Sequence, residues 1–139
     1  MIQELRYEDI AVGDQASFSK TVSESDIYLF AGITGDFNPM HVDQEYAKKT
    51  IFGERIAHGM LTASFISTVL GMKLPGPNTI YLSQNVRFLA PVRIGDTLTV
   101  TAEVIEKNDR KRQIRLQTKI VNQQGTIVAD GEALVMKKG

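Results

Sequence analysis

The hydrophobic pattern divides the chain into a mixed first half and a strand-rich second half. In the second half, β-branched residues and an alternation of apolar and polar positions predict four strands, over residues 79–89, 97–106, 113–122 and 127–137. Turn-forming residues at 108–112 and 122–125 join the last three of these segments as hairpins. The second half therefore predicts an antiparallel sheet.

The first half predicts one more strand and a capped helix. A weak alternation favours a strand over residues 14–22. Ser23 is a good N-cap for a following helix. In addition, Glu24 and Asp26 place acidic side chains at the positive end of that helix. After this helix we expect a loop over residues 32–39.

The longest predicted helix covers residues 59–71 and follows a short helix capped by Asp43. Its apolar positions run nearly all the way round, which predicts burial on most sides. A long buried helix beside antiparallel strands predicts an α+β fold, in which a curved antiparallel sheet wraps around the helix. No linker or repeat divides the chain, so we expect residues 1–139 to form a single domain.

Composition removes several classes of function. The chain has no cysteine, which excludes thiol nucleophiles, disulfides and thiolate metal sites. Lys and Arg number 16 and balance 16 Asp and Glu, so no overall charge favours nucleic acid or an anionic membrane. The longest run without Asp, Glu, Lys or Arg, residues 56–72, is shorter than the roughly 20 residues that span a bilayer. The N-terminus has no signal-peptide pattern, so we expect a cytoplasmic protein.

One short segment, residues 30–41, concentrates polar chemistry. It places a carboxylate at Asp36, an amide at Asn38 and an imidazole at His41, while Pro39 excludes one regular helix through all three. A carboxylate beside an imidazole is a candidate acid–base pair, because imidazole titrates near neutral pH. The alternative interpretation is a turn aspartate, a turn asparagine and a structural histidine, and the spacing alone leaves both open.

Gly59 gives a second candidate feature, at the start of the long predicted helix. The first N–H groups of a helix lack partners within it and lie at its positive end, so a ligand carbonyl near Gly59 would meet hydrogen-bond donors. The alternative is that this glycine only permits a tight turn. Ser64, Ser67 and Thr68 share one side of the same helix, where hydroxyls serve a nearby carboxylate or bond back to helix carbonyls. Two histidines without cysteine make a poor metal site, and we expect none.

Three blocks of the sequence resemble the MaoC-like proteins, the family of the (R)-specific enoyl-CoA hydratases. Phe30, residues 33–41 (ITGDFNPMH) and Ala47 match the signature of this family. Residues 56–61 (IAHGML) are similar to the family's block at the head of its central helix, and residues 80–96 to the strand block that follows. The resemblance covers nearly the whole chain.

The resemblance implies a hot-dog fold and a homodimer that binds a coenzyme A thioester in a tunnel between its subunits. It implies Asp36 and His41 as the catalytic dyad, supported by Asn38, and the Gly59 N–H as a donor to the thioester oxygen. Ser67 falls at the position of a hydroxyl that supports the aspartate. The acyl chain is expected to contact three side chains of the central helix, Leu61, Phe65 and Leu70.

The expected reaction is the reversible addition of water to a trans-2-enoyl-CoA, which gives an (R)-3-hydroxyacyl-CoA. Asp36 is expected to take a proton from water, and His41 to orient that water and return a proton to the α carbon. This chemistry needs no metal or redox cofactor, and coenzyme A arrives as part of the substrate. A thioesterase, a non-catalytic acyl-CoA-binding domain and a dehydratase of carrier-protein substrates are the alternatives that the sequence leaves open.

Overall fold

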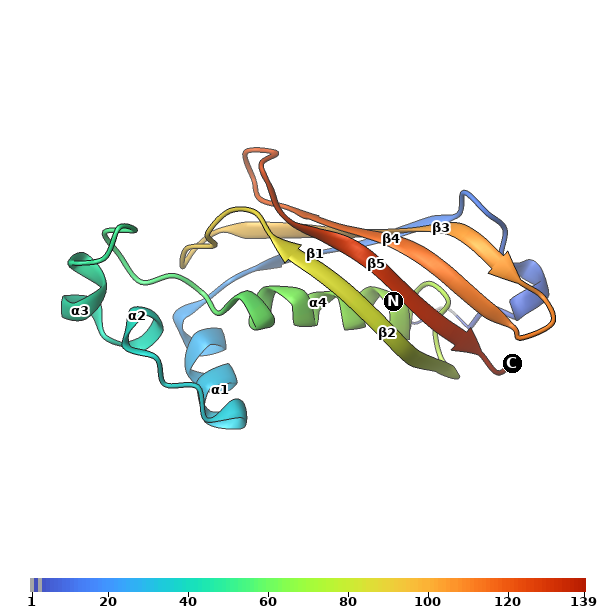
Figure 1. Cartoon of the computed structure of the whole chain (residues 1–139), viewed down its shortest axis with the longest axis horizontal. Coiled ribbons are helices and arrows are strands. Elements are labelled where there is room, and N and C mark those ends of the chain that lie inside the picture. The colour runs from blue at the N-terminus through green and yellow to red at the C-terminus, as the bar shows by residue number, and fades with distance from the viewer. Residues whose placement is uncertain (1, 3) are drawn as a thin grey trace.

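A single antiparallel sheet organises the computed structural model, which describes residues 2 and 4–139 (Figure 1). Within those residues the sheet has five strands in the order β1-β3-β4-β5-β2, and every neighbouring pair is antiparallel. The strands are β1 (Gln15–Thr21), β2 (Thr79–Phe88), β3 (Thr97–Asn108), β4 (Gln113–Val121) and β5 (Ile127–Lys137). All five predicted strands are confirmed, and together with the helices they make an α+β fold.

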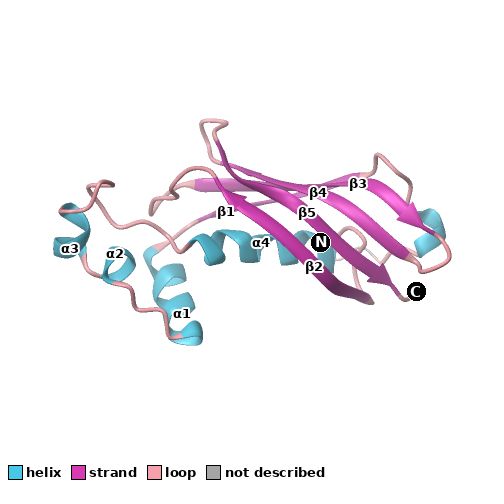
Figure 2. Cartoon of the chain, viewed as in Figure 1, coloured by secondary structure: helices cyan, strands magenta, loops and turns pink. Residues whose placement is uncertain are grey.

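The helix α4 (Gly59–Met72) lies along one face of this sheet, as Figure 2 shows. Positions along β3 and β4 alternate between buried and more exposed, so one face of the sheet is apolar and covered. The buried side of α4 joins the hydrophobic core on that face through Ile66, Val69 and Leu70. Neither α4 nor any other helix in the described residues is long and apolar enough to cross a bilayer.

The prediction that α4 is buried on most sides was wrong for a single chain. Met60, Ser64, Ser67 and Gly71 are exposed. A helix that lies on one sheet contacts it along one stripe only, and the exposed positions recur at intervals of three or four residues. They therefore form one open side of α4. Three of the four exposed residues are serine or glycine, so the sequence already indicated a less apolar side of this helix.

Three helices precede α4 at one end of the molecule (Figure 1). They are α1 (Glu24–Thr34), α2 (Pro39–Val42) and α3 (Gln44–Lys48). Both predicted caps are confirmed. Ser23 and Asp26 form a reciprocal capping box at the start of α1, and the Asp43 carboxylate accepts two backbone N–H groups at the start of α3.

The loop between α1 and α2 is shorter than the predicted loop over residues 32–39. The helix α1 continues to Thr34 and ends where Gly35 adopts the left-handed conformation, with φ of 83°. Pro39 then opens α2, since proline is well tolerated in the first turn of a helix. The short loop that remains between the two helices carries Asp36.

Candidate active site

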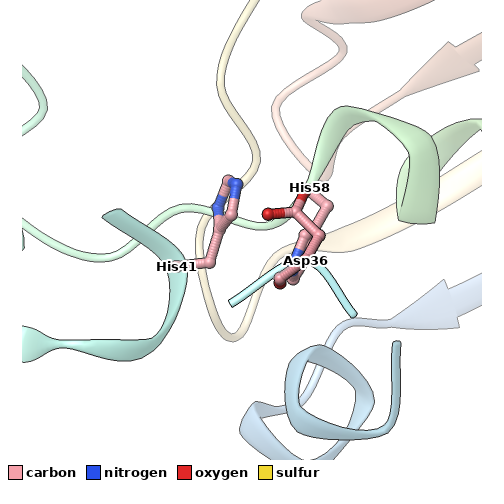
Figure 3. Close-up of side chains that lie close together, drawn as sticks. All are labelled: Asp36, His41 and His58. Atoms are coloured by element: carbon pink, nitrogen blue, oxygen red, sulfur yellow. The ribbon is translucent and has the colours of Figure 1, made fainter. Parts of the chain in front are cut away.

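Asp36, His41 and His58 come together from three different segments (Figure 3). Asp36 lies in the loop after α1, His41 in α2, and His58 directly before α4. Each side chain offers one nitrogen or oxygen atom, and these three atoms lie within 4.8 Å of one another. In Figure 3 a carboxylate oxygen of Asp36 points toward the His41 ring. The structure therefore brings the two residues of the predicted dyad together, with a second histidine beside them.

Local hydrogen bonds orient the loop that carries Asp36. The Asp36 N–H donates to Thr34 Oγ1 (3.2 Å), and Asp36 Oδ1 accepts the backbone N–H of Asn38 (3.1 Å). Asn38 Oδ1 in turn accepts the Met40 N–H (3.1 Å) and caps α2. Asn38 therefore shapes the turn, as the alternative interpretation of the sequence expected, while the Asp36 side chain remains exposed to solvent.

A backbone carbonyl selects which nitrogen of the His41 ring carries the proton. Nδ1 of His41 lies 2.7 Å from the carbonyl oxygen of Ile56. A carbonyl oxygen only accepts, so Nδ1 is the donor, and Nε2 of the neutral ring is left as an acceptor. Burial lowers the pKa of His41 below its ordinary value of 6.5; the nearby His58 acts in the same direction, whereas the Ile56 carbonyl and Asp36 oppose it. The ring is thus uncharged near neutral pH.

His58 is the residue of this group that sequence reasoning missed. Its side chain is 2% exposed, and its ring stacks on the His41 ring with centroids 4.0 Å apart. It also contacts the ring of Phe30, with centroids 4.9 Å apart, and its Nε2 lies 3.0 Å from the Asp36 carbonyl oxygen. A signal was present in the sequence, since His58 is one of only two histidines and directly precedes the glycine that starts the long helix.

The stacked rings disfavour a metal ion shared by this cluster. An imidazole binds a metal through a lone pair in the plane of its ring, at about 2.0–2.1 Å for zinc. The rings of His41 and His58 are stacked 4.0 Å apart and inclined by only 29°, so their lone pairs do not converge on one ion. The geometry therefore gives no reason to revise the expectation of a site without metal.

An apolar pocket of about 420 Å³ lies beside His41 and reaches the start of α4. Gly59 and Thr62 contribute to its lining from α4, and residues 88–92 supply much of the opposite wall. The side chain of His58 makes no capping hydrogen bond to α4, and the Leu61 and Thr62 N–H groups donate to the His58 carbonyl, so the N–H groups of Gly59 and Met60 remain available to a ligand. The pocket thus joins an imidazole, helix N–H donors and an apolar wall.

Gly59 does not owe its place to a left-handed turn, because it is not one of the glycines with a positive φ. A Cβ atom at this position would lie 3.1 Å from Cδ1 and Cε1 of the Phe88 ring. That separation is too short for an ordinary carbon–carbon contact. The absence of a side chain at Gly59 therefore leaves room between the start of α4 and the pocket wall.

The other predicted site residues lie elsewhere on α4. Leu61 and Leu70 belong to the hydrophobic core, with 7% and 1% exposure, and Phe65 packs against that core. Ser67 lies on the open side of the helix, about two turns from its start, and no hydrogen bond joins it to the dyad among the described residues. Within one chain, the structure does not bring these four residues to the pocket.

Comparisons with known proteins give consistent matches. A family model described as the MaoC like domain matches residues 10–125. The (R)-specific enoyl-CoA hydratase of Rhodospirillum rubrum is 53% identical over 130 residues, which are 94% of this chain and 90% of that protein. The 3-hydroxybutyryl-CoA dehydratase of Methylorubrum extorquens is 49% identical in an alignment of 139 positions, which covers 97% of this chain and 87% of that protein.

Solved structures of high similarity share the whole fold. The R-hydratase PhaJ1 from Pseudomonas aeruginosa, in its unliganded form, matches with a TM-score of 0.93 and 46% identity, over 98% of this chain and 87% of that one. The (R)-hydratase from A. caviae matches with a TM-score of 0.91 and 39% identity, over 94% of this chain and 98% of that one. This likeness confirms the hot-dog fold that the sequence predicted.

We expect the His41 imidazole to titrate with a midpoint below 6.5, because burial disfavours its charged form. The pH dependence of the ring proton resonances measures this midpoint by NMR. The chain has two histidines, so the spectrum of a His41→Asn variant assigns both signals. A midpoint at or above 6.5 for His41 would contradict the uncharged ring.

Proposed function

This chain belongs to the MaoC-like domain family, and on that premise we propose that it is an (R)-specific enoyl-CoA hydratase. As a hydro-lyase it adds water reversibly to a trans-2-enoyl-CoA and forms an (R)-3-hydroxyacyl-CoA, with residues 1–139 acting as one domain. The observation that carries the proposal is the cluster of Asp36 and His41 beside an apolar pocket that reaches Gly59. Hydration of crotonyl-CoA, with chiral analysis of the product, tests it directly.

The two groups of the dyad suit a single bound water molecule. The Asp36 carboxylate is an acceptor, and Nε2 of neutral His41 is a second acceptor. A water that donates one O–H to each group has its oxygen lone pairs free to attack the β carbon of the enoyl thioester. Two fixed acceptors therefore select both the position and the orientation of the nucleophile.

The proposed reaction proceeds by addition of water and transfer of one proton. The water oxygen forms a bond to the β carbon as Asp36 takes one of its protons, and the electron pair of the carbon–carbon double bond shifts toward the thioester oxygen. That proton then passes from Asp36 to Nε2 of His41, and the resulting imidazolium transfers it to the α carbon. The Gly59 N–H, at the positive end of α4, stabilises the negative charge on the thioester oxygen.

The names of the relatives support a coenzyme A thioester as the substrate. The two relatives at 53% and 49% identity are named for enoyl-CoA and 3-hydroxybutyryl-CoA, whereas a mitochondrial 3-hydroxyacyl-[acyl-carrier-protein] dehydratase of Arabidopsis thaliana is 34% identical. The proposed steps are a carbon–oxygen bond formation and proton transfers, so the proposal assigns no metal or redox cofactor. It places the activity in the cytoplasm, where coenzyme A thioesters are available.

A homodimer is part of the proposal, with β2 as the contact strand. This strand lies at one edge of the sheet and exposes Ile80, Tyr81 and Leu82. An edge strand has unpaired backbone groups that a second copy can pair, which would extend the sheet across both subunits. Such pairing would also bring a second chain toward the open side of α4, where Ser67 lies.

We expect light scattering to give the mass of a dimer at micromolar concentration. Leu82→Lys would place a charge in the proposed contact and shift the mass toward the 15.4 kDa of one chain. Ser17→Lys, on the opposite edge strand β1, is the matched control and should leave the dimer intact. A monomeric wild-type chain would contradict the proposed assembly.

Asp36→Asn should lower the hydration turnover by at least ~100-fold, the usual scale for an acid–base group, because an amide does not take a proton from water. His41→Ala should have a similar effect. Both proteins should keep a wild-type circular dichroism spectrum, since Asp36 is exposed and neither residue belongs to the hydrophobic core. Glu106→Gln, which neutralises an exposed acid on β3, is the control and should be fully active. Near-wild-type hydration by a folded Asp36→Asn protein would refute its assignment as the base.

Gly59→Val should reduce hydration far more than it reduces stability. Its side chain would enter the space between α4 and Phe88, where the thioester is proposed to lie, and we expect a loss on the order of 100-fold in kcat/KM. Glycine is itself a weak helix former, and the Phe88 ring is 49% exposed and can shift away from the added side chain, so the change in the free energy of unfolding should stay within about 1 kcal/mol. Gly32→Val in α1, where an added Cβ meets nothing within 4 Å, is the control. Thermal melting and hydration rates decide the matter, because a loss of activity in proportion to lost stability would remove Gly59 from the site.

A further inference from the structure

His58 is the most constrained polar side chain of the site and has no role in the proposed reaction. It is buried, with 2% exposure, and it contacts both members of the dyad. Its ring stacks on the ring of His41, and its Nε2 lies 3.0 Å from the backbone carbonyl oxygen of Asp36. Among the described residues, no other side chain both stacks on the His41 ring and makes a hydrogen bond to the Asp36 backbone.

The hydrogen bond to Asp36 determines which nitrogen of His58 carries the proton. A backbone carbonyl only accepts, so Nε2 of His58 is the donor. Nδ1 is buried and has no hydrogen-bond partner among the described residues. In the uncharged ring, Nδ1 is therefore a bare acceptor.

An unpartnered buried acceptor costs stability, which argues against a purely space-filling role. Phenylalanine would fill a similar volume beside Phe30 and His41 without leaving a polar atom unsatisfied. The hydrogen bond from Nε2 therefore explains why this position holds a histidine. That nitrogen donates to the loop that carries the proposed base.

We propose that His58 is a positioning residue of the site, which holds the Asp36 loop with its Nε2–H and supports the His41 ring with its own ring. This inference rests on the proposed hydratase function. The Ile56 carbonyl fixes the rotation of His41 within its ring plane, and the stacked His58 ring limits the tilt of that plane. One side chain thereby sets the distance between the carboxylate and the imidazole that share the water.

The charges around His41 support this role. The titratable groups that act on His41 are Asp36, which favours the imidazolium, and His58, which opposes it. The elements packed around the pocket add no further charge there, since α4 contributes Gly59 and Thr62, and residues 88–92 are apolar. Loss of the His58 imidazole should therefore raise the pKa of His41.

Two variants separate the functions of the two parts of the His58 side chain. His58→Phe keeps a ring beside His41 and loses the donor, whereas His58→Gln keeps a donor at a similar reach and loses the ring. For each we expect the turnover of crotonyl-CoA to fall by at least ~10-fold, with KM within about twofold of wild type. The acid limb of the pH profile should move to higher pH in both variants, because the acid limb follows protonation of His41. Tyr28→Phe, which keeps its ring and loses a hydrogen bond from Arg55, is the control and should match wild type.

The outcomes distinguish this inference from the proposed function. A wild-type chain that does not hydrate crotonyl-CoA would refute the hydratase assignment itself. An active wild type, with wild-type turnover and an unmoved acid limb in both His58 variants, would overturn the positioning role alone. Activity lost only in proportion to the folded fraction, with the acid limb unmoved, would show a structural residue and also overturn it. If neither variant folds, the ¹⁵N shifts of the wild-type His58 ring at neutral pH decide, since an Nε2 without a proton would contradict the bond to Asp36.

Discussion

The hydrogen bond from His41 Nδ1–H to the Ile56 carbonyl is the interaction on which the rest of the site depends. It leaves Nε2 as the acceptor that the proposed reaction uses, and burial lowers the pKa of the ring and so favours its uncharged form. The segment that provides this carbonyl is itself anchored on both sides. The Ile56 N–H donates to the Met40 carbonyl (3.3 Å), and the Ala57 N–H donates to the Val92 carbonyl (2.7 Å). The imidazole is therefore aligned by backbone that is tied to α2 and to the wall of the pocket.

The same short segment aligns every other part of the site. His58 contacts the loop that carries Asp36, and Gly59 then begins α4 beside the pocket. The carbonyl that accepts from His41, the His58 side chain and the proposed Gly59 donor thus all come from residues 56–59, and α4 is fixed by its packing on the sheet. The proposed base is different in this respect, because Asp36 stands on an exposed loop whose own hydrogen bonds span only a few residues. That contrast explains why a side chain from the anchored segment is needed to hold the loop.

The helices and strands were accessible from the sequence because they depend on local physics, whereas the spacing of Asp36 and His41 offered only a candidate pair and the family resemblance implied the dyad. Alternation, capping residues and helical spacing act over a few positions, so the strands, the N-cap at Ser23 and the start of α4 followed from them. The loop before Asp36 was placed too early, because Gly32 interrupts the pattern while the helix ends only at the left-handed Gly35. The role of His58 was out of reach, since its contacts with Asp36 and His41 join residues that are 22 and 17 positions away. Residues 88–92 were missed as a pocket wall for the same reason, and Ser67 lies on a side of α4 that one chain leaves open.

The Ile56 carbonyl also has an evolutionary consequence. Any amino acid presents the same carbonyl group, so mutation at this position can replace the side chain and keep the contact that sets the tautomer of His41. Selection on that contact would then act on the path of the main chain, whereas the Ile56 side chain answers to a separate constraint, its place in the apolar lining of the pocket. An alignment of relatives would record the imidazole and the carboxylate as constrained and would pass over the group that makes the imidazole competent.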